Sequence, residues 1–300
     1  MTAGSPTTSL ETPTASRQLG VLMLIAASVL WSLAGLAVKT ARIPNPVVFV
    51  FYRCVAAAVP MALLIRLSAG KAPGPRLMGL SIVTYAAVVG FLIASMTIDT
   101  AATGILLQYT SPVFCAIFGW AFYRRRINRR TMLSLIIAAA GIAIMLGFRP
   151  IGQQRVGPLM GLLSGVAFGA LPLILAEIDR RARGQANLFL VVFCNNLGAA
   201  MIFLVIIASQ WGIAPMKLEL WQFAIVAGAG VFQIALPYVL FQLALRRVNP
   251  VDASLLVLLE PVLNPIWVLI FVGEKPGPGT LIGGAAILVA LVVEATKKKN

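Results

Sequence analysis

The sequence predicts an all-α integral membrane protein whose ten transmembrane helices form two inverted five-helix repeats around a central cavity. Three observations support this prediction. Hydrophobic residues make up 60% of the 300-residue chain and charged residues only 11%, with a mean hydropathy of +0.94, whereas a soluble domain carries roughly 25% charged residues. Apolar runs of about 20 residues, the length of a membrane-spanning helix, recur along the chain. The two halves of the chain also align with each other.

Ten apolar stretches are long enough to cross a bilayer as helices. They cover residues 19–39, 46–67, 77–96, 101–122, 131–147, 157–177, 186–209, 218–245, 251–272 and 280–295. Residues 1–16 are rich in Ser, Thr and Pro and lack the basic start of a signal peptide, so we expect a disordered cytoplasmic tail there. The two repeats would then occupy residues 17–150 and 151–296, followed by a basic cytoplasmic tail at 297–300.

The net charge of +15 does not indicate nucleic-acid binding, because the basic residues are scattered between apolar spans and do not gather on one soluble face. If the N-terminus is cytoplasmic, most of them fall on the cytoplasmic side. These are Arg17, Arg66, Lys71, Arg76, Arg124, Arg125, Arg126, Arg129, Arg130, Arg180, Arg181, Arg183, Arg246, Arg247, Lys297, Lys298 and Lys299. The opposite side carries Lys39, Arg42, Arg149, Arg155, Lys217 and Lys275. This bias follows the positive-inside rule, so we expect a multi-pass protein of a bacterial inner membrane with both termini cytoplasmic.

An internal repeat relates the two halves. The aligned pairs are Leu107 with Leu256, Pro112 with Pro261, Thr131 with Thr280, Gly20 with Gly157, and Trp31 with Phe168. Because each half has an odd number of spans, the second half must enter the membrane from the opposite side. Inverted repeats are a transporter architecture, in which the two halves exchange conformations. A duplication that only stabilises the fold is the alternative.

Two ionisable residues lie well inside the predicted spans. Arg53 is in the second span, and Glu260 is near the middle of the ninth. A charge near the bilayer centre costs roughly 2.5–3.5 kcal/mol, so such residues usually face a cavity or a partner. Both are therefore candidates for substrate binding. The alternative is a buried ion pair or hydrogen-bond clamp that only holds helices together.

Polar side chains continue along matching faces of two aligned spans. Glu260 and Asn264 share one face of the ninth span, and Gln108 and Ser111 share the corresponding face of the fourth. Helix packing through small residues is the alternative explanation. The fourth, eighth and ninth spans contain Pro112, Pro237 and Pro261, respectively. Each proline removes a backbone hydrogen-bond donor within its span. Breaks in corresponding membrane helices point to a binding site.

Weaker candidates for lining the cavity are Trp31, Tyr85, Phe168, Asn195, Asn196, Gln233 and Tyr238. Asn195 falls opposite Arg53 if the second and seventh spans are aligned. Aromatic residues in membrane helices more often pack or anchor the helix at the interface, which is the alternative for Tyr85 and Phe168.

The absence of histidine limits the chemistry, because it excludes a His-based triad, a histidine metal site and an imidazole proton relay. Cys54, Cys115 and Cys194 lie in separate spans without the paired spacing of a zinc site or a redox dithiol. We therefore expect no metal, no cofactor and no enzymatic activity.

These motifs resemble the EamA type of the drug/metabolite transporter superfamily over nearly all of the chain. The residues that carry the resemblance are Trp31, the segments 51–53, 108–112 and 253–261, and Gly273-Glu274. The first half departs from the family pattern, since Arg124-Arg125 stand where Gly-Glu is usual. The chain looks most like the YddG-type exporters of aromatic and neutral amino acids. This resemblance implies a cavity walled by spans one to four and six to nine, with spans five and ten peripheral.

The expected function is alternating-access export of small metabolites, most of all neutral and aromatic amino acids, by a protein that works as a monomer in contact with membrane lipid. Glu260 would carry the proton if export is coupled to proton antiport. An exporter of cationic or quaternary ammonium drugs is the nearest alternative. A membrane scaffold or assembly protein without transport is an alternative of another class.

Overall fold

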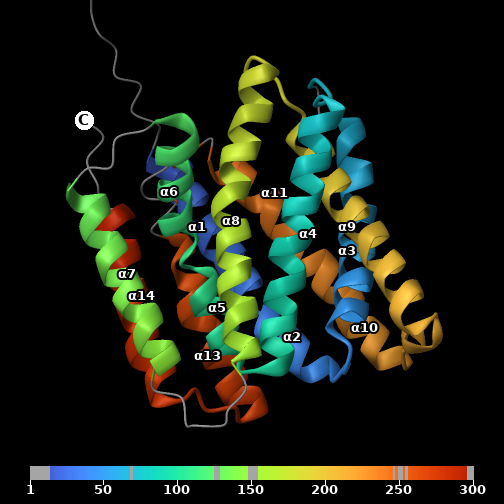
Figure 1. Cartoon of the computed structure of the whole chain (residues 1–300). Helices are drawn as coiled ribbons and strands as arrows, with labels where there is room; N and C mark the ends of the chain where they lie inside the picture. Colours follow the sequence, from blue (N-terminus) through green and yellow to red (C-terminus); the bar gives the residue numbers. More distant parts are fainter. Residues whose placement is uncertain are drawn as a thin grey trace, which may run out of the picture.

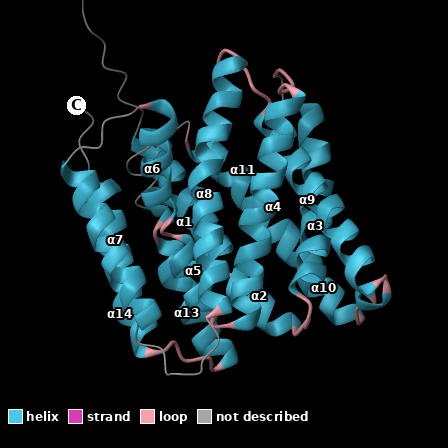
Figure 2. Ribbon diagram, viewed as in Figure 1, coloured by secondary structure: helices cyan, strands magenta, loops and turns pink. Residues whose placement is uncertain are grey.

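The structure is a computed structural model that describes residues 14–67, 70–124, 129–147, 155–245, 247–248, 253 and 256–295. Within these residues the regular structure is helical, and the one isolated β-bridge joins Lys71 to Ala186 (Figure 2). Eight helices are long and apolar enough to cross a membrane, and two shorter apolar helices cover Leu259–Val272 and Pro278–Val293. The chain therefore has the all-helical, multi-pass character that the sequence predicts.

The first part of the chain supplies seven of the helices. They are α1 (Thr14–Ser32), α2 (Ala34–Ala41), α3 (Pro46–Leu67), α4 (Pro75–Ile98), α5 (Ala101–Gln108), α6 (Ser111–Tyr123) and α7 (Arg129–Gly147). The expected tail at 1–16 lies largely outside the described residues, and α1 already begins at Thr14.

The second part of the chain contains the remaining elements. They are α8 (Val156–Arg181), α9 (Leu188–Trp211), the 3₁₀ turn η1 (Ala214–Met216), α10 (Leu220–Gly228), the π-helix η2 (Ala229–Ala235), α11 (Leu236–Ala244), α13 (Leu259–Val272) and α14 (Pro278–Ala295). Residues 249–252 and 254–255, which begin the expected ninth span, lie outside the described residues, as does the tail at 297–300.

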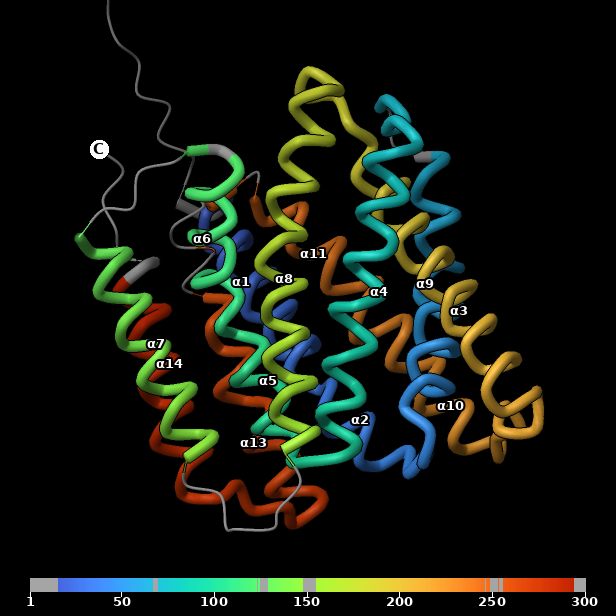
Figure 3. Tube along the Cα trace, viewed as in Figure 1, coloured from blue at the N-terminus to red at the C-terminus, as the bar shows by residue number. Residues whose placement is uncertain are grey.

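Three of the long spans are interrupted (Figure 3), and in the ninth expected span a turn at Leu258 precedes α13. Leu33 separates α1 from α2, and its N–H bonds to the Leu30 carbonyl in a tightened turn. Tyr109 and Thr110 separate α5 from α6, and η2 separates α10 from α11. The second and third interruptions come just before Pro112 and Pro237, where proline leaves a carbonyl of the preceding turn without its donor. Proline does not always have this effect, because α8 continues through Pro172.

The long helices pack in pairs that join the two parts of the chain (Figure 1). α4 packs along α8, α3 along α9, α7 along α14, and α1 along α11. The α7–α14 pair stands at one edge, where a Cβ added to Gly141 would lie 2.7 Å from the Gly283 carbonyl oxygen. Only residues without a side chain allow two membrane helices to approach this closely.

Helix ends gather on two opposite faces of the bundle, called here the upper and lower faces as drawn in Figure 1. The ends of α3, α6 and α8 and the starts of α4, α7 and α9 form the upper face. The end of α2, the α4–α5 junction and the loop between α13 and α14 form the lower face.

Candidate functional site

A tyrosine and a glutamate connect two interrupted segments of the bundle. The Tyr109 hydroxyl donates a 2.7 Å hydrogen bond to Oε2 of Glu260. Tyr109 lies at the break between α5 and α6, and Glu260 lies in the first turn of α13, just after the turn at Leu258. The carboxylate is partly buried. A polar contact thus joins the fourth and ninth predicted spans where their helices change direction.

Aromatic rings from α1 and α11 pack against one another, and one of them, Tyr238, lies within electrostatic range of Glu260. Trp31 meets Tyr238 edge-on with ring centroids 5.7 Å apart, and it meets Phe241 at a tilt with ring centroids 5.5 Å apart. Tyr238 is near enough to interact electrostatically with both Glu260 and Tyr85. Glu260 therefore has aromatic side chains in its neighbourhood, a setting suited to recognition of an ammonium group.

Arg53 forms a clamp across three elements. Its side chain is 2% exposed, and its Nη1 donates a 3.0 Å hydrogen bond to Oε1 of Gln233 in η2. The Gln233 amide donates in turn to the Trp31 carbonyl at 3.3 Å, the carbonyl just before the break at Leu33. This arrangement brings two predicted site residues together and matches the clamp that was the alternative to direct substrate binding.

Other predicted residues bond between helices. Tyr85 donates its hydroxyl to Oδ1 of Asn196 at 2.9 Å, linking α4 to α9. Gln108 donates to Oγ of Ser164 at 2.9 Å, and Ser164 donates to the Val88 carbonyl at 2.8 Å. Gln108 therefore helps to hold α5 against α8 and α4.

Two buried amides have atoms that are not hydrogen bonded within the described structure. Asn195 is 4% exposed and its Oδ1 has no partner; Asn264 is fully buried and neither its Oδ1 nor its Nδ2 has one. A buried polar group without a partner costs about 1–3 kcal/mol. Such groups are candidates for contacts that form only with substrate or in another conformation.

The remaining predicted residues are less closely connected to Glu260. Ser111 is 8% exposed at the start of α6, and Phe168 on α8 packs against the main apolar core. Pro112 and Pro237 lie in the first turns of α6 and α11, and Pro261 in the first turn of α13. Among the described residues, no three His, Cys, Asp or Glu side chains are grouped as metal ligands.

Tyr109 was not selected from the sequence as a site residue, whereas Trp31 and Tyr238 were weaker candidates for lining the cavity. Tyr109 directly follows Gln108 in the 108–112 segment, so its position before Pro112 was a usable signal. The contact between Trp31 and Tyr238 was not predicted, because it depends on how α1 packs against α11.

An open pocket of about 250 Å³ lies between α2 and the α10–η2 segment. Its walls are mostly apolar, and the polar side chains that line it are Thr40 and Gln233, the partner of Arg53. The lining residues are Leu33, Leu36, Ala37, Thr40, Ile225, Gly228, Ala229, Phe232 and Gln233. The clamp is thus next to a pocket that begins at the break in the first span.

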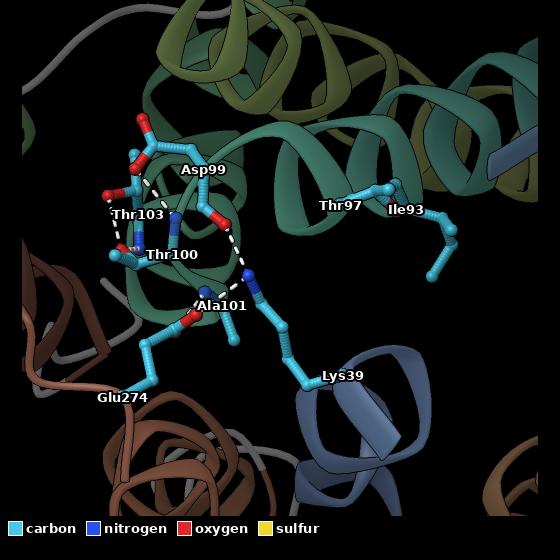
Figure 4. A network of polar contacts seen from close by, with 8 residues as sticks. All are labelled: Lys39, Ile93, Thr97, Asp99, Thr100, Ala101, Thr103 and Glu274. Carbon is cyan, nitrogen blue, oxygen red and sulfur yellow. Dashed lines mark hydrogen bonds and ion pairs between the residues drawn. The ribbon is translucent and has the colours of Figure 1, made fainter. Parts of the chain in front are cut away.

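A second polar network joins three segments at the lower face (Figure 4). Lys39 at the end of α2 forms a 2.7 Å ion pair with Oε2 of Glu274 and donates a 2.6 Å hydrogen bond to the Asp99 carbonyl. Oε1 of Glu274 accepts a 2.8 Å hydrogen bond from the Ala101 N–H at the start of α5. Lys39 was expected only as a topological marker, and its pairing with Glu274 was not predicted.

Comparison with known proteins agrees with this architecture. An uncharacterized transporter of Archaeoglobus fulgidus is 27% identical over 74% of this chain and 76% of its own length. The threonine/homoserine exporter RhtA of Escherichia coli is 29% identical over 65% of this chain and 63% of its own length. A crystal structure with 20% sequence identity superposes with a TM-score of 0.62, covering 93% of this chain and 98% of that one, which supports the fold.

The EamA-like transporter family matches residues 18–147 and again residues 155–295. The relatives are membrane transporters, so the prediction that the chain is not an enzyme is confirmed and the scaffold alternative is set aside. The two matched ranges together cover most of the chain, and the structure is the helical bundle described above. This chain is therefore a membrane transporter that belongs to the EamA-like transporter family.

Proposed function

We propose that this transporter exports neutral amino acids from bacteria by alternating access, as a monomer of ten spans in two inverted halves. The halves are residues 17–150 and 151–296, and the lower face is periplasmic. The observation that carries the proposal is the bond between Tyr109 and Glu260, which places a carboxylate where two interrupted helices meet. Inverted repeats with discontinuous helices at their interface are how such carriers place a substrate near the bilayer midplane.

The helix pairs support the inverted repeat. If each helix of one half is exchanged for its counterpart in the other, the α4–α8 pair becomes the α1–α11 pair, and the α3–α9 and α7–α14 pairs are unchanged. The two ranges matched by the family support the same division of the chain. The surplus of basic residues near the helix ends of the upper face supports a cytoplasmic upper face.

The side chains around Glu260 suggest how an amino acid would bind. The substrate ammonium would bind the Glu260 carboxylate, with Trp31 and Tyr238 adding aromatic faces beside the positive charge. The side chain would rest on the rings of Trp31 and Phe241. Amide groups would bind the substrate carboxylate. Arg53 would also bind it after breaking its hydrogen bond to Gln233.

The relatives support amino acids as the substrate class. The similar protein of E. coli is named a threonine/homoserine exporter, so small hydroxylated amino acids join the aromatic ones as substrates to test. If protons drive export, Glu260 would exchange a proton for the substrate ammonium, because it is the acid that lies at the meeting of the interrupted helices.

A lipophilic cation is the second candidate substrate. A carboxylate beside Trp31 and Tyr238 would also suit a quaternary ammonium drug, which needs a negative group and aromatic walls but no partner for a carboxylate.

Counterflow into liposomes containing the purified protein separates these possibilities. Liposomes would be preloaded in turn with threonine, homoserine, methionine, phenylalanine or tetraphenylphosphonium, and uptake of the labelled compound compared with protein-free liposomes. We expect counterflow with at least one neutral amino acid and no competition from the cation. Counterflow with the cation alone would favour the drug exporter, and no counterflow with any amino acid would refute the proposal.

A further inference from the structure

We propose that Lys39, Glu274 and the Ala101 N–H form a latch that closes the lower face and must open for each transport cycle. This inference rests on the proposed alternating access and adds the element that controls one side of it. The latch joins α2 and the α4–α5 junction, both in the first half, to the α13–α14 loop in the second half (Figure 4).

The contacts of the latch are short and mutually dependent. Both side chains are 18% exposed, so the ion pair is shielded from most of the solvent but is not sealed in the core. Glu274 uses one oxygen for Lys39 and the other for Ala101, and Lys39 also donates to the Asp99 carbonyl. Loss of Lys39 removes both contacts of α2 in the latch, and loss of Glu274 removes both contacts of the α13–α14 loop.

The helices that the latch holds are separate from the rest of their spans. α2 has eight residues and is set off from α1 at Leu33, and α5 has eight residues and is set off from α6 at Tyr109 and Thr110. Such short segments can tilt while α1 and α6 keep their packing. The second of these breaks carries the Tyr109 hydroxyl that binds Glu260, so a substrate that replaces this bond acts directly on a hinge of the latch.

A buried amide lies against α2, the helix that carries Lys39. Asn264 is fully buried, and within the described residues neither of its amide atoms has a hydrogen-bond partner. A Cβ on Gly35 of α2 would lie 2.5 Å from its Oδ1 and 2.7 Å from the Cβ of Ala101. Gly35 of α2 therefore covers Asn264 on one side, and α13 also packs against α5, the other short helix that the latch fixes. Movement of α2 and α5 would expose this amide to the lower face, where water or substrate can supply the bonds it lacks.

The acid of the latch is present at the lower face and is not repeated at the matching position of the first half. In the internal repeat, the first half has Arg124-Arg125 where the second has Gly273-Glu274, so the acid that makes the latch has no equivalent in the first half. The described conformation, with the latch formed, is thus closed at the lower face by a contact that the sequence does not duplicate.

Accessibility of a buried cysteine tests the latch without any substrate. Val268 is 1% exposed and lies one helical turn beyond Asn264, also facing Gly35. Val268→Cys would be introduced after replacing Cys54, Cys115 and Cys194 by alanine, and labelled with a membrane-impermeant maleimide from the lower face. We expect Lys39→Gln and Glu274→Gln each to speed labelling at least tenfold. Lys217→Gln, which removes an exposed charge near the same face, is the matched control and should leave labelling unchanged.

Folding of the variants is checked by elution volume and thermal unfolding, and Glu274→Gln keeps an oxygen that can accept from Ala101. In a separate protein, Lys39→Cys and Glu274→Cys would be joined by a cleavable thiol crosslinker, which should abolish counterflow until the crosslink is reduced. Unchanged labelling in both charge variants, or full counterflow by the crosslinked protein, would overturn the latch. Absence of counterflow in the wild type would instead refute the proposed function, because the labelling result is independent of transport.

Discussion

The replacement Glu260→Gln gives the sharpest test of the proposed substrate site. A glutamine keeps an oxygen that can accept the hydrogen bond from Tyr109, now 2.7 Å long, so the junction of α5, α6 and α13 is expected to survive. What disappears is the negative charge offered to the substrate ammonium. A hydrogen bond to a charged group contributes about 1.5–3 kcal/mol, which corresponds to a loss of about 10- to 150-fold in affinity at 1.4 kcal/mol per factor of ten.

Isothermal titration of detergent-purified protein with phenylalanine and threonine would measure this loss, using the substrate that shows counterflow in the wild type. Glu219→Gln, at an exposed position before α10, is the matched control for loss of an acid and should bind as the wild type does. The same titration with 3-phenylpropionate, which lacks the ammonium, should show no difference between wild type and Glu260→Gln. Amino acid binding within twofold of the wild type in Glu260→Gln would refute the assignment of the ammonium to Glu260.

Three further replacements have expected outcomes. Asn264→Leu removes the two unpartnered amide atoms, so we expect a higher melting temperature by differential scanning fluorimetry together with slower counterflow; a lower melting temperature would contradict the idea that the amide is unsatisfied in this conformation. Gly141→Val places a side chain where even a Cβ would be 2.7 Å from the Gly283 carbonyl oxygen, and should lower the melting temperature by several degrees while the folded fraction still binds substrate, since α7 and α14 are at the edge of the bundle. Arg53→Lys keeps the charge but loses the planar fork, and should weaken substrate binding about tenfold; unaltered binding and melting temperature would show that the bond to Gln233 has no role in either.

Much of the helical architecture could be predicted from the sequence, because membrane-spanning helices need long apolar runs and those runs are visible without any structure. The interruptions were only partly predictable. Pro112 and Pro237 indicated where two spans change direction, but the break at Leu33 has no proline nearby. Helix conformation there is decided by packing against other spans, which local sequence does not encode.

The polar contacts show the same limit. Arg53 and Glu260 were identifiable because an ionisable residue within a span is costly, yet their partners Gln233 and Tyr109 follow from the distances between helices that are remote in sequence. The ion pair of Lys39 with Glu274 joins the first span to the loop after the ninth. Neither composition nor periodicity indicates such contacts. The contacts become visible only in the three-dimensional structure.

The π-helix η2 also sets the angular position of everything that follows it in the eighth span. Each residue of an α-helix turns the chain by about 100°, so the additional residue accommodated in the wide turn rotates α11 by that amount relative to α10. The rings of Tyr238 and Phe241 face Trp31 in this orientation. Deleting one residue between Ala229 and Ala235 would let the turn return to regular α-helical geometry. Tyr238 and Phe241 would then rotate away from the indole of Trp31, so the aromatic contacts of the site would be lost although its side chains are unchanged.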